Sequence, residues 1–251
     1  MTSRKLRVAV IGPRGQAGSC VIDELLTRGH AIVGVSRNPP KQWKHLTGDG
    51  MYSSTSVDIF TEQKKLIDIF SSDFDAIVCA FGPSLTNLAR VYEDGVEAHG
   101  RIKTALLAST YEGPFIIVGG AGYIHVANRL QLTDQKDFAY SWWWTWPDEH
   151  LDYMTERGPD HRSRFISVIA VLMEWSRAHS DRDSSENDHV LCVRTGEYKL
   201  FIDTPEDPAV EAAENGIYNQ DMAVAIVDEV ENNKLAFKHW SWTGPIGLRR
   251  W

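Results

Sequence analysis

Short apolar runs alternate with longer amphipathic stretches from the start of the chain to about residue 119. An uninterrupted apolar run is typical of a strand buried on both faces of a parallel sheet, and apolar residues three and four apart are typical of a helix packed on one face. We therefore predict strands at Arg7–Ile11, Ala31–Ser36, 51–58, 75–81 and 115–119, and helices at 19–28, 62–70 and 85–109. This alternation predicts an α/β fold with a right-handed, doubly wound parallel sheet.

The second half of the chain has a less regular pattern. Residues 162–178 carry apolar side chains at helical spacing and predict an amphipathic helix, whereas the polar stretch 179–188 predicts a loop. Two further strands are predicted at 189–194 and 198–202, and a last helix at Asn219–Asn232. No linker or internal repeat separates the halves, so we expect one domain over residues 1–251.

Three glycines follow the first strand at a spacing that suits a dinucleotide. Gly12 allows a sharp turn, Gly15 leaves the backbone bare where a pyrophosphate approaches, and Gly18 lets the next helix pack closely. The amides at the helix start then face the phosphates. The triplet lies between a strand and a helix, as the motif requires, so we predict that Gly12, Arg14, Gly15, Gln16, Ala17 and Gly18 bind a cofactor. The alternative is a tight turn that has lost its ligand.

The residues after the second strand favour NADP(H) over NAD. Ser36 and Arg37 stand where NAD-binding proteins usually place an acid for the ribose 2′-hydroxyl, and a guanidinium suits a 2′-phosphate instead. Arg14 is near enough in the turn to reach the same phosphate. Further cofactor contacts are expected where the other strands end, at Asp58, Ile59, Ala80, Phe81, Gly82, Gly119 and Gly120.

Composition excludes several classes of protein. The 251 residues are 43% hydrophobic and 24% charged, which is typical of a globular protein. The net charge of −8 argues against nucleic acid and anionic membrane partners. Three widely spaced cysteines predict neither disulfides nor a metal site, and no signal peptide is evident, so a cytoplasmic protein is expected.

Several motifs in order resemble the atypical short-chain dehydrogenases/reductases, in the branch with NmrA-like proteins, NAD(P)H-binding flavin and biliverdin reductases, and fungal tailoring reductases. They are the glycine turn, residues 36–39, Asp58, residues 118–122, and later 194–198 and 219–223. The resemblance covers about residues 5–135 well and 190–232 moderately. It implies a Rossmann-type fold with a dinucleotide-binding core at 1–135, an irregular substrate-covering part at 136–251, and an NADPH site, but no shared substrate.

The chain departs from this pattern in three places. Pro13 and Arg14 replace the usual Ala-Thr of the turn, and proline removes one amide N–H. The sequence has no Tyr-x-x-x-Lys pair. Its nearest equivalent is Tyr153 with Arg157, which has arginine in place of the lysine. The apolar, proline-containing substrate segment that the family often has before its Thr-Gly-x-Tyr turn is missing, because 189–194 runs directly into Thr195.

Candidate chemical groups follow the fifth strand. Ligands of open α/β sheets lie beyond the carboxyl ends of the strands, so Tyr123 is predicted as a proton donor and His125 as a general acid or base. Asp148 and His150 are further acid–base candidates. His150, Asp152 and His161 lack metal-ligand spacing, so no metal site is predicted.

A tryptophan cluster forms the second unusual feature of the chain. Trp142, Trp143, Trp144 and Trp146 cannot all be buried by one strand or helix face, so they are predicted, with Tyr153, to cover a flat apolar substrate. A packing insert or a homodimer contact is the alternative.

Three functions therefore remain open. The first is an NADPH-dependent oxidoreductase reducing an apolar, aromatic or polycyclic small molecule in secondary metabolism. The second is a non-redox isomerase, cyclase or dehydratase on the same scaffold, which the missing Tyr-Lys pair favours. The third is an NADP-sensing regulator with a protein partner. Fold alone does not decide among them.

Overall fold

The computed structural model describes residues 4–43, 51–82, 91–119, 124–125, 166–169, 194–214, 217 and 219–244. These residues form a single sheet with the strand order β3-β2-β1-β4-β5-β6-β8-β7. All neighbouring strands are parallel except β7 and β8, which are antiparallel. The strands are β1 Arg7–Ile11, β2 Ala31–Ser36, β3 Tyr52–Ser56, β4 Ala76–Cys79, β5 Phe115–Val118, β6 Ile166–Ile169, β7 Lys199–Ile202 and β8 His239–Thr243. The predicted α/β fold with a doubly wound parallel sheet is confirmed.

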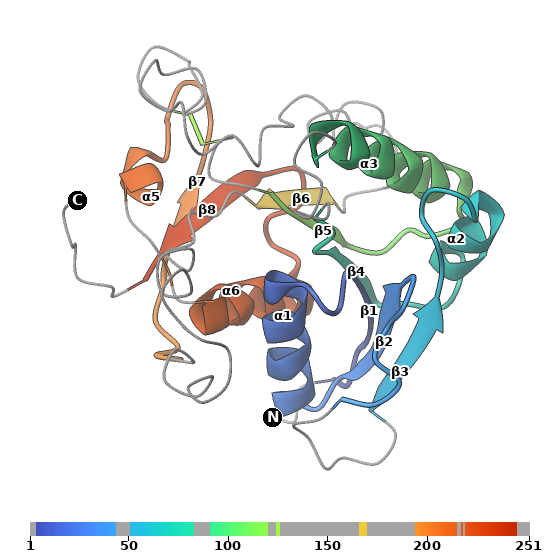
Figure 1. Ribbon diagram of the computed structural model, residues 1–251. Coiled ribbons are helices and arrows are strands. Elements are labelled where there is room, and N and C mark those ends of the chain that lie inside the picture. Colours follow the sequence, from blue (N-terminus) through green and yellow to red (C-terminus); the bar gives the residue numbers. More distant parts are fainter. Residues whose placement is uncertain are drawn as a thin grey trace, which may run out of the picture.

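Helices cover both faces of this sheet (Figure 1). Helix α1 (Gln16–Thr27) lies beside α6 (Asn219–Asn232) on one face, and α2 (Gln63–Phe70) lies beside α3 (Val91–Ala108) on the other. A short helix, α5 (Val210–Glu214), contacts β8. None of the helices in the described part of the chain is both long and apolar enough to span a membrane.

The alternation of side chains along β1 explains the two cores. Val8 and Val10 pack with α1 and α6, while Ala9 and Ile11 pack with α2 and α3. Because successive strand residues point to opposite faces, a strand covered on both sides must be apolar throughout. This is why the runs of the first half were recognisable as strands.

The second half contains one wrong prediction and one missed strand. Residues 166–169, predicted as part of a helix at 162–178, form β6 in parallel register with β5. The run is short and rich in β-branched residues, so the spacing of its apolar residues fits either a helix or a strand. It forms a strand here because it pairs with the edge of β5. Strand β8 was not predicted, although its two tryptophans, Trp240 and Trp242, are fully buried. Residues 189–193 of the strand expected at 189–194 lie outside the described residues. Arg194 is described and is not in a strand.

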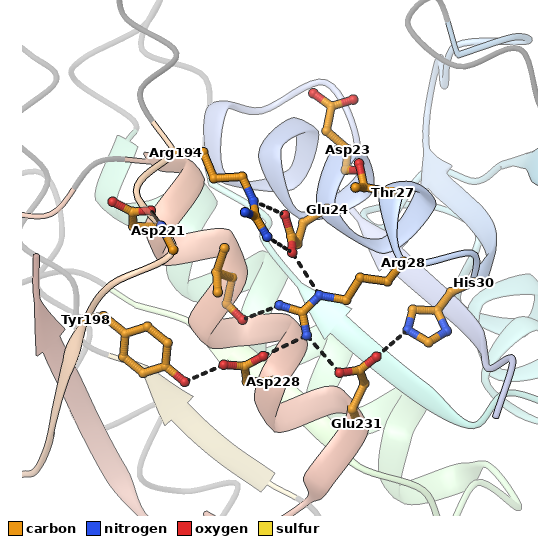
Figure 2. Close-up of polar contacts among 12 residues, drawn as sticks. Asp23, Glu24, Thr27, Arg28, His30, Arg194, Tyr198, Asp221, Asp228 and Glu231 are labelled. Atoms are coloured by element: carbon orange, nitrogen blue, oxygen red, sulfur yellow. Dashed lines mark hydrogen bonds and ion pairs between the residues drawn. The ribbon is translucent and has the colours of Figure 1, made fainter. Parts of the chain in front are cut away.

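The segment 194–198 is hydrogen-bonded to both α1 and α6 (Figure 2). Arg194 donates to both carboxylate oxygens of Glu24 at 2.8 Å. Asp221, in the first turn of α6, accepts from the amides of Thr195 and Gly196 at 2.8 and 2.7 Å. Two motifs on which the family resemblance rests, 194–198 and 219–223, are thus joined to each other.

Candidate functional site

The glycine turn lies at the carboxyl edge of the parallel strands. Ile11, the last residue of β1, is level with Val35 on β2 and Cys79 on β4. The amide of Gly12 donates to the Val35 carbonyl at 3.0 Å, and the amide of Ala80 donates to the Ile11 carbonyl at 3.0 Å. The turn after β1 therefore lies between the ends of its two neighbours, where open α/β sheets bind their ligands.

Two of the three glycines are required by the local geometry. Gly12 has a φ of +83°, and a Cβ there would lie 2.7 Å from the Ala80 carbonyl oxygen. A Cβ at Gly18 would lie 2.2 Å from the carbonyl oxygen of Gly12, which is far inside van der Waals contact. The helix consequently packs directly against the turn, as predicted for a dinucleotide-binding unit.

Helix α1 presents bare amides at this turn. It begins at Gln16, three residues earlier than predicted, so Gln16, Ala17 and Gly18 form its first turn. Amides of a first turn have no intrahelical acceptor, and no side chain caps this helix. The side-chain Nε2 of Gln16 is also buried, with no hydrogen-bond partner among the described residues. These unsatisfied donors, beside a backbone that a Cβ would block, fit the pyrophosphate of a dinucleotide.

Positive charge at this end of α1 has no acidic partner among the residues that the structure describes. Arg14 in the turn and Arg37 after β2 are both exposed, and neither forms an ion pair within the described residues. The first turn of α1 also carries no acidic residue. Ser36, the last residue of β2, is half-buried beside Arg37. The donor set therefore suits an anion with several phosphate groups.

The ends of β3 and β4 supply the neighbouring apolar surface. Ile59 is buried, while the Asp58 carboxylate accepts from the amide of Phe60 at 2.9 Å. The ring of Phe81 packs edge-on against Phe60 and against His99 of α3. Burial lowers the pKa of His99 to about 4, opposed by a hydrogen bond with the Phe81 backbone, so His99 is neutral at pH 7.

His125 lies in a second polar cluster. Its Nδ1 is 2.8 Å from Oδ2 of Asp203, and its backbone amide donates to both oxygens of the same carboxylate. Nδ1 of His239, the first residue of β8, lies 2.7 Å from the same Oδ2. Sequence reasoning missed Asp203 and His239, because 78 and 36 residues separate the successive members and no local pattern connects them.

Asp203 is the centre of this cluster and has no exposed side-chain surface. Its own amide donates to the His239 carbonyl at 2.9 Å, and the amide of Ala209 donates to Oδ1 at 2.9 Å. Burial alone would raise the pKa of Asp203, but the approach of His239 and the amides of Ala209 and His125 lower it below its usual value. The ionised carboxylate orients the His125 imidazole and leaves Nε2 for proton exchange, which is an arrangement suited to a general acid or base.

The remaining predicted residues fall into two groups, of which the first is described by the structure and the second is not. Gly119 follows β5 and is half-buried, and Ala80 and Gly82 follow β4 beside the turn. The other candidates fall in segments that the structure does not describe: Gly120, Tyr123, Trp142, Trp143, Trp144, Trp146, Asp148, His150 and Tyr153. The proton-donor, lid and acid–base roles given to these residues stay predictions.

Comparison with known proteins supports the fold. No family model matches the chain. It is 28% identical over 240 residues to the uncharacterized protein YwnB of Bacillus subtilis, covering 90% of this chain and 93% of that protein. Among solved structures, it resembles a "putative epimerase" from Bacteroides thetaiotaomicron with a TM-score of 0.68 at 18% identity, covering 98% of this chain and all of the other.

A second solved structure is nearly as similar. It is a "putative NADH-flavin reductase" from Streptococcus pneumoniae, with a TM-score of 0.64 at 20% identity over 95% of this chain and 99% of the other. At these identities the likeness concerns the fold rather than the activity. The strand order and the glycine turn agree with it, so the chain has an α/β fold of the Rossmann type.

Proposed function

We propose that this chain is an NADPH-dependent reductase of the atypical short-chain dehydrogenase kind, acting on an apolar aromatic or polycyclic small molecule of secondary metabolism. The observation that carries the proposal is the turn at 12–18, where steric contacts require glycine and where α1 presents unsatisfied amides. Backbone amides at a helix start favour a pyrophosphate. The "putative NADH-flavin reductase" among similar folds is consistent with this activity.

Specificity for NADPH is assigned to the two arginines near the turn. Arg37 follows β2, where the ribose of the adenosine half is expected, and Arg14 belongs to the turn itself. Neither has a carboxylate partner within the described residues that would compete for it. A planar guanidinium binds a phosphate with two parallel hydrogen bonds, so these side chains favour a 2′-phosphate over a 2′-hydroxyl.

The roles of the other residues follow from their places around the turn. Bound nicotinamide would supply the hydride. Phe81 and Ile59 exclude water beside the cofactor, and His125, held by Asp203, exchanges a proton through Nε2. The predicted lid of Trp142, Trp143, Trp144 and Trp146 would stack on a flat substrate.

A fluorescence titration of the purified protein tests the cofactor assignment. NADPH is expected to bind with enhanced, blue-shifted nicotinamide emission and at least about tenfold more tightly than NADH, since one charged hydrogen-bonded pair is worth roughly 1.5–3 kcal/mol. Oxidation of NADPH in the presence of flavins, quinones and polycyclic ketones then tests reduction. Failure of both cofactors to bind at millimolar concentration would refute the proposal.

The non-redox alternative remains a second candidate because of two observations. The chain has no Tyr-x-x-x-Lys pair, and a "putative epimerase" is among the most similar folds. If NADPH binds and a substrate is rearranged without consumption of NADPH, the protein is an isomerase rather than a reductase. Binding of NADPH and a protein, with no turnover of either kind, would favour the regulator.

A further inference from the structure

The cluster of His125, Asp203 and His239 has the composition of a metal site. All three residues are buried, and one potential ligand atom from each lies within 4.8 Å of the other two. Both imidazoles approach the same carboxylate oxygen, at 2.8 Å from His125 and 2.7 Å from His239. Three groups that each carry a lone pair for a cation thus converge on one point in the interior.

The hydrogen bonding of His239 is incomplete without a further partner. Its Nδ1 is close to Asp203 but lies off the direction of a hydrogen bond, and its Nε2 is buried with no hydrogen-bond partner among the described residues. The His239 side chain is only 7% exposed, so bulk solvent has little access to it. An unsatisfied buried polar group costs free energy unless a partner is supplied, and a metal ion is a partner that imidazole nitrogens accept.

The charge of the cluster is also uncompensated by any strong cation. Asp203 is fully buried, and within the described residues it contacts no lysine or arginine. Its partners are two imidazoles and the amides of His125 and Ala209. A divalent cation would neutralise the carboxylate where it now has only weak donors.

The two nitrogen–oxygen distances require only a small adjustment for coordination. Two ligand atoms that are each about 2.0–2.1 Å from a tetrahedral ion lie roughly 3.3 Å apart. The nitrogen–oxygen distances of 2.7 and 2.8 Å would therefore open by about 0.5 Å around the ion. Oδ1 would keep its hydrogen bond from the Ala209 amide, which would hold the carboxylate in place while Oδ2 contacts the ion.

We propose that His125, Asp203 and His239 bind one divalent transition-metal ion of the Zn²⁺ class. Two imidazole nitrogens and one carboxylate suit Zn²⁺, Co²⁺ or Ni²⁺, whereas Mg²⁺ and Ca²⁺ prefer oxygen ligands. Three protein ligands leave a coordination position for water or an oxygen atom of a ligand, and with the ion bound this water would take over the proton exchange assigned above to His125. The ion would lie near the carboxyl ends of β5 and β6, because His239 is level with Val168 and Ile117, two strand spacings or about 10 Å from β5.

Titration of tag-free, chelator-treated protein with Co²⁺ tests this site. One equivalent is expected to bind, to give visible d–d absorption typical of four- or five-coordinate cobalt, and to be displaced by Zn²⁺ but not by millimolar Mg²⁺. Asp203→Asn and His239→Gln are each expected to weaken Co²⁺ binding more than about 100-fold, since outer-shell changes alone cost 10–100-fold.

His30→Gln is the matched control. His30 is also fully buried and also pairs with a carboxylate, Glu231 at 3.0 Å, but only one imidazole is present there. This variant is expected to keep the full Co²⁺ signal. Zinc-edge anomalous diffraction from soaked wild-type crystals provides a readout that does not depend on variants folding. An ion found elsewhere, no stoichiometric binding, or equal binding by all three variants would overturn the proposal.

Discussion

The two ends of α1 differ in whether the nearby arginines form ion pairs. At the carboxyl-terminal end, Arg28 contacts Glu24 at 2.8 Å, Asp228 at 2.6 Å and Glu231 at 2.7 Å (Figure 2). Burial alone would lower the pKa of Arg28, but these carboxylates raise it well above its usual value. At the amino-terminal end, Arg14 and the nearby Arg37 have no carboxylate partner within the described residues.

This difference separates a structural cluster from a binding site. Arg28 and Glu24 tie α1 to α6 and to Arg194, so each buried charge is already satisfied. The amino-terminal end combines the positive end of the helix dipole with free amides, a condition that is stable in water but favours an anion. Charged side chains that pair with each other, as at Arg28, indicate a structural role. Charged side chains without such a partner, beside the free amides of the glycine turn, indicate a binding site for an anion.

The largest effect is expected from Gly18→Ala. The new Cβ would meet the Gly12 carbonyl oxygen at 2.2 Å, so either α1 or the turn must move. We expect a loss of about 2–3 kcal/mol in unfolding free energy and at least tenfold weaker NADPH binding. Urea denaturation and fluorescence titration measure the two effects.

Gly100→Ala is the control for this variant. Gly100 is also a helical glycine, in α3, but a Cβ there meets nothing within 4 Å. It should stabilise the protein by about 0.5–1 kcal/mol and leave NADPH binding unchanged. Equal behaviour of the two variants would mean that the contact between the turn and α1 is not required.

Glu24→Gln tests the other end of α1. It leaves Arg28 and Arg194 without their shared carboxylate, and we expect a loss of about 2 kcal/mol in unfolding free energy. NADPH affinity should stay within twofold of the wild type. A loss of NADPH affinity with unchanged stability would reverse the assignment of the two ends.

Arg37→Ala sharpens the description of the binding end. Because Arg37 is exposed and forms no ion pair within the described part of the chain, its removal should change stability by less than about 0.5 kcal/mol. NADPH affinity should fall about 10–30-fold while NADH affinity changes little. Equal weakening of both cofactors, measured by titration, would show that Arg37 does not contact a 2′-phosphate.

The smallest effect concerns pH. Burial alone would raise the pKa of Glu24, but hydrogen bonds from Arg194 and Arg28 lower it below 4.5. Its stabilising contribution is therefore complete above about pH 4.5 and is lost as the pH falls through the folded-state pKa. The difference in urea midpoint between wild type and Glu24→Gln should shrink between pH 5 and pH 3. A constant difference would show that the Glu24 charge is not responsible.

The first half of the fold was predictable because β1, β2, β4 and β5 are buried along nearly their whole length. The apolar runs at Arg7–Ile11 and Ala31–Ser36 match β1 and β2 residue for residue, and the glycine turn has the steric constraints its spacing implies. Helix α1 begins earlier than predicted because the turn itself supplies its first residues.

The second half depends on partners that sequence spacing does not reveal. Residues 166–169 become a strand only because β5 and β8 lie on either side of them. Arg28 meets Asp228 across 200 positions of the chain, and His125 meets Asp203 across 78. The alternation of Trp240 and Trp242 was a usable signal, since aromatic residues two apart indicate a strand, although β8 is buried at every position.

A crystal structure in excess NADPH would show whether the turn at 12–18 binds the dinucleotide. We expect pyrophosphate oxygens on the amides of Gln16 and Ala17 and the 2′-phosphate beside Arg37. A turn without bound nucleotide at saturating NADPH, or a nucleotide bound away from residues 12–18, would contradict it.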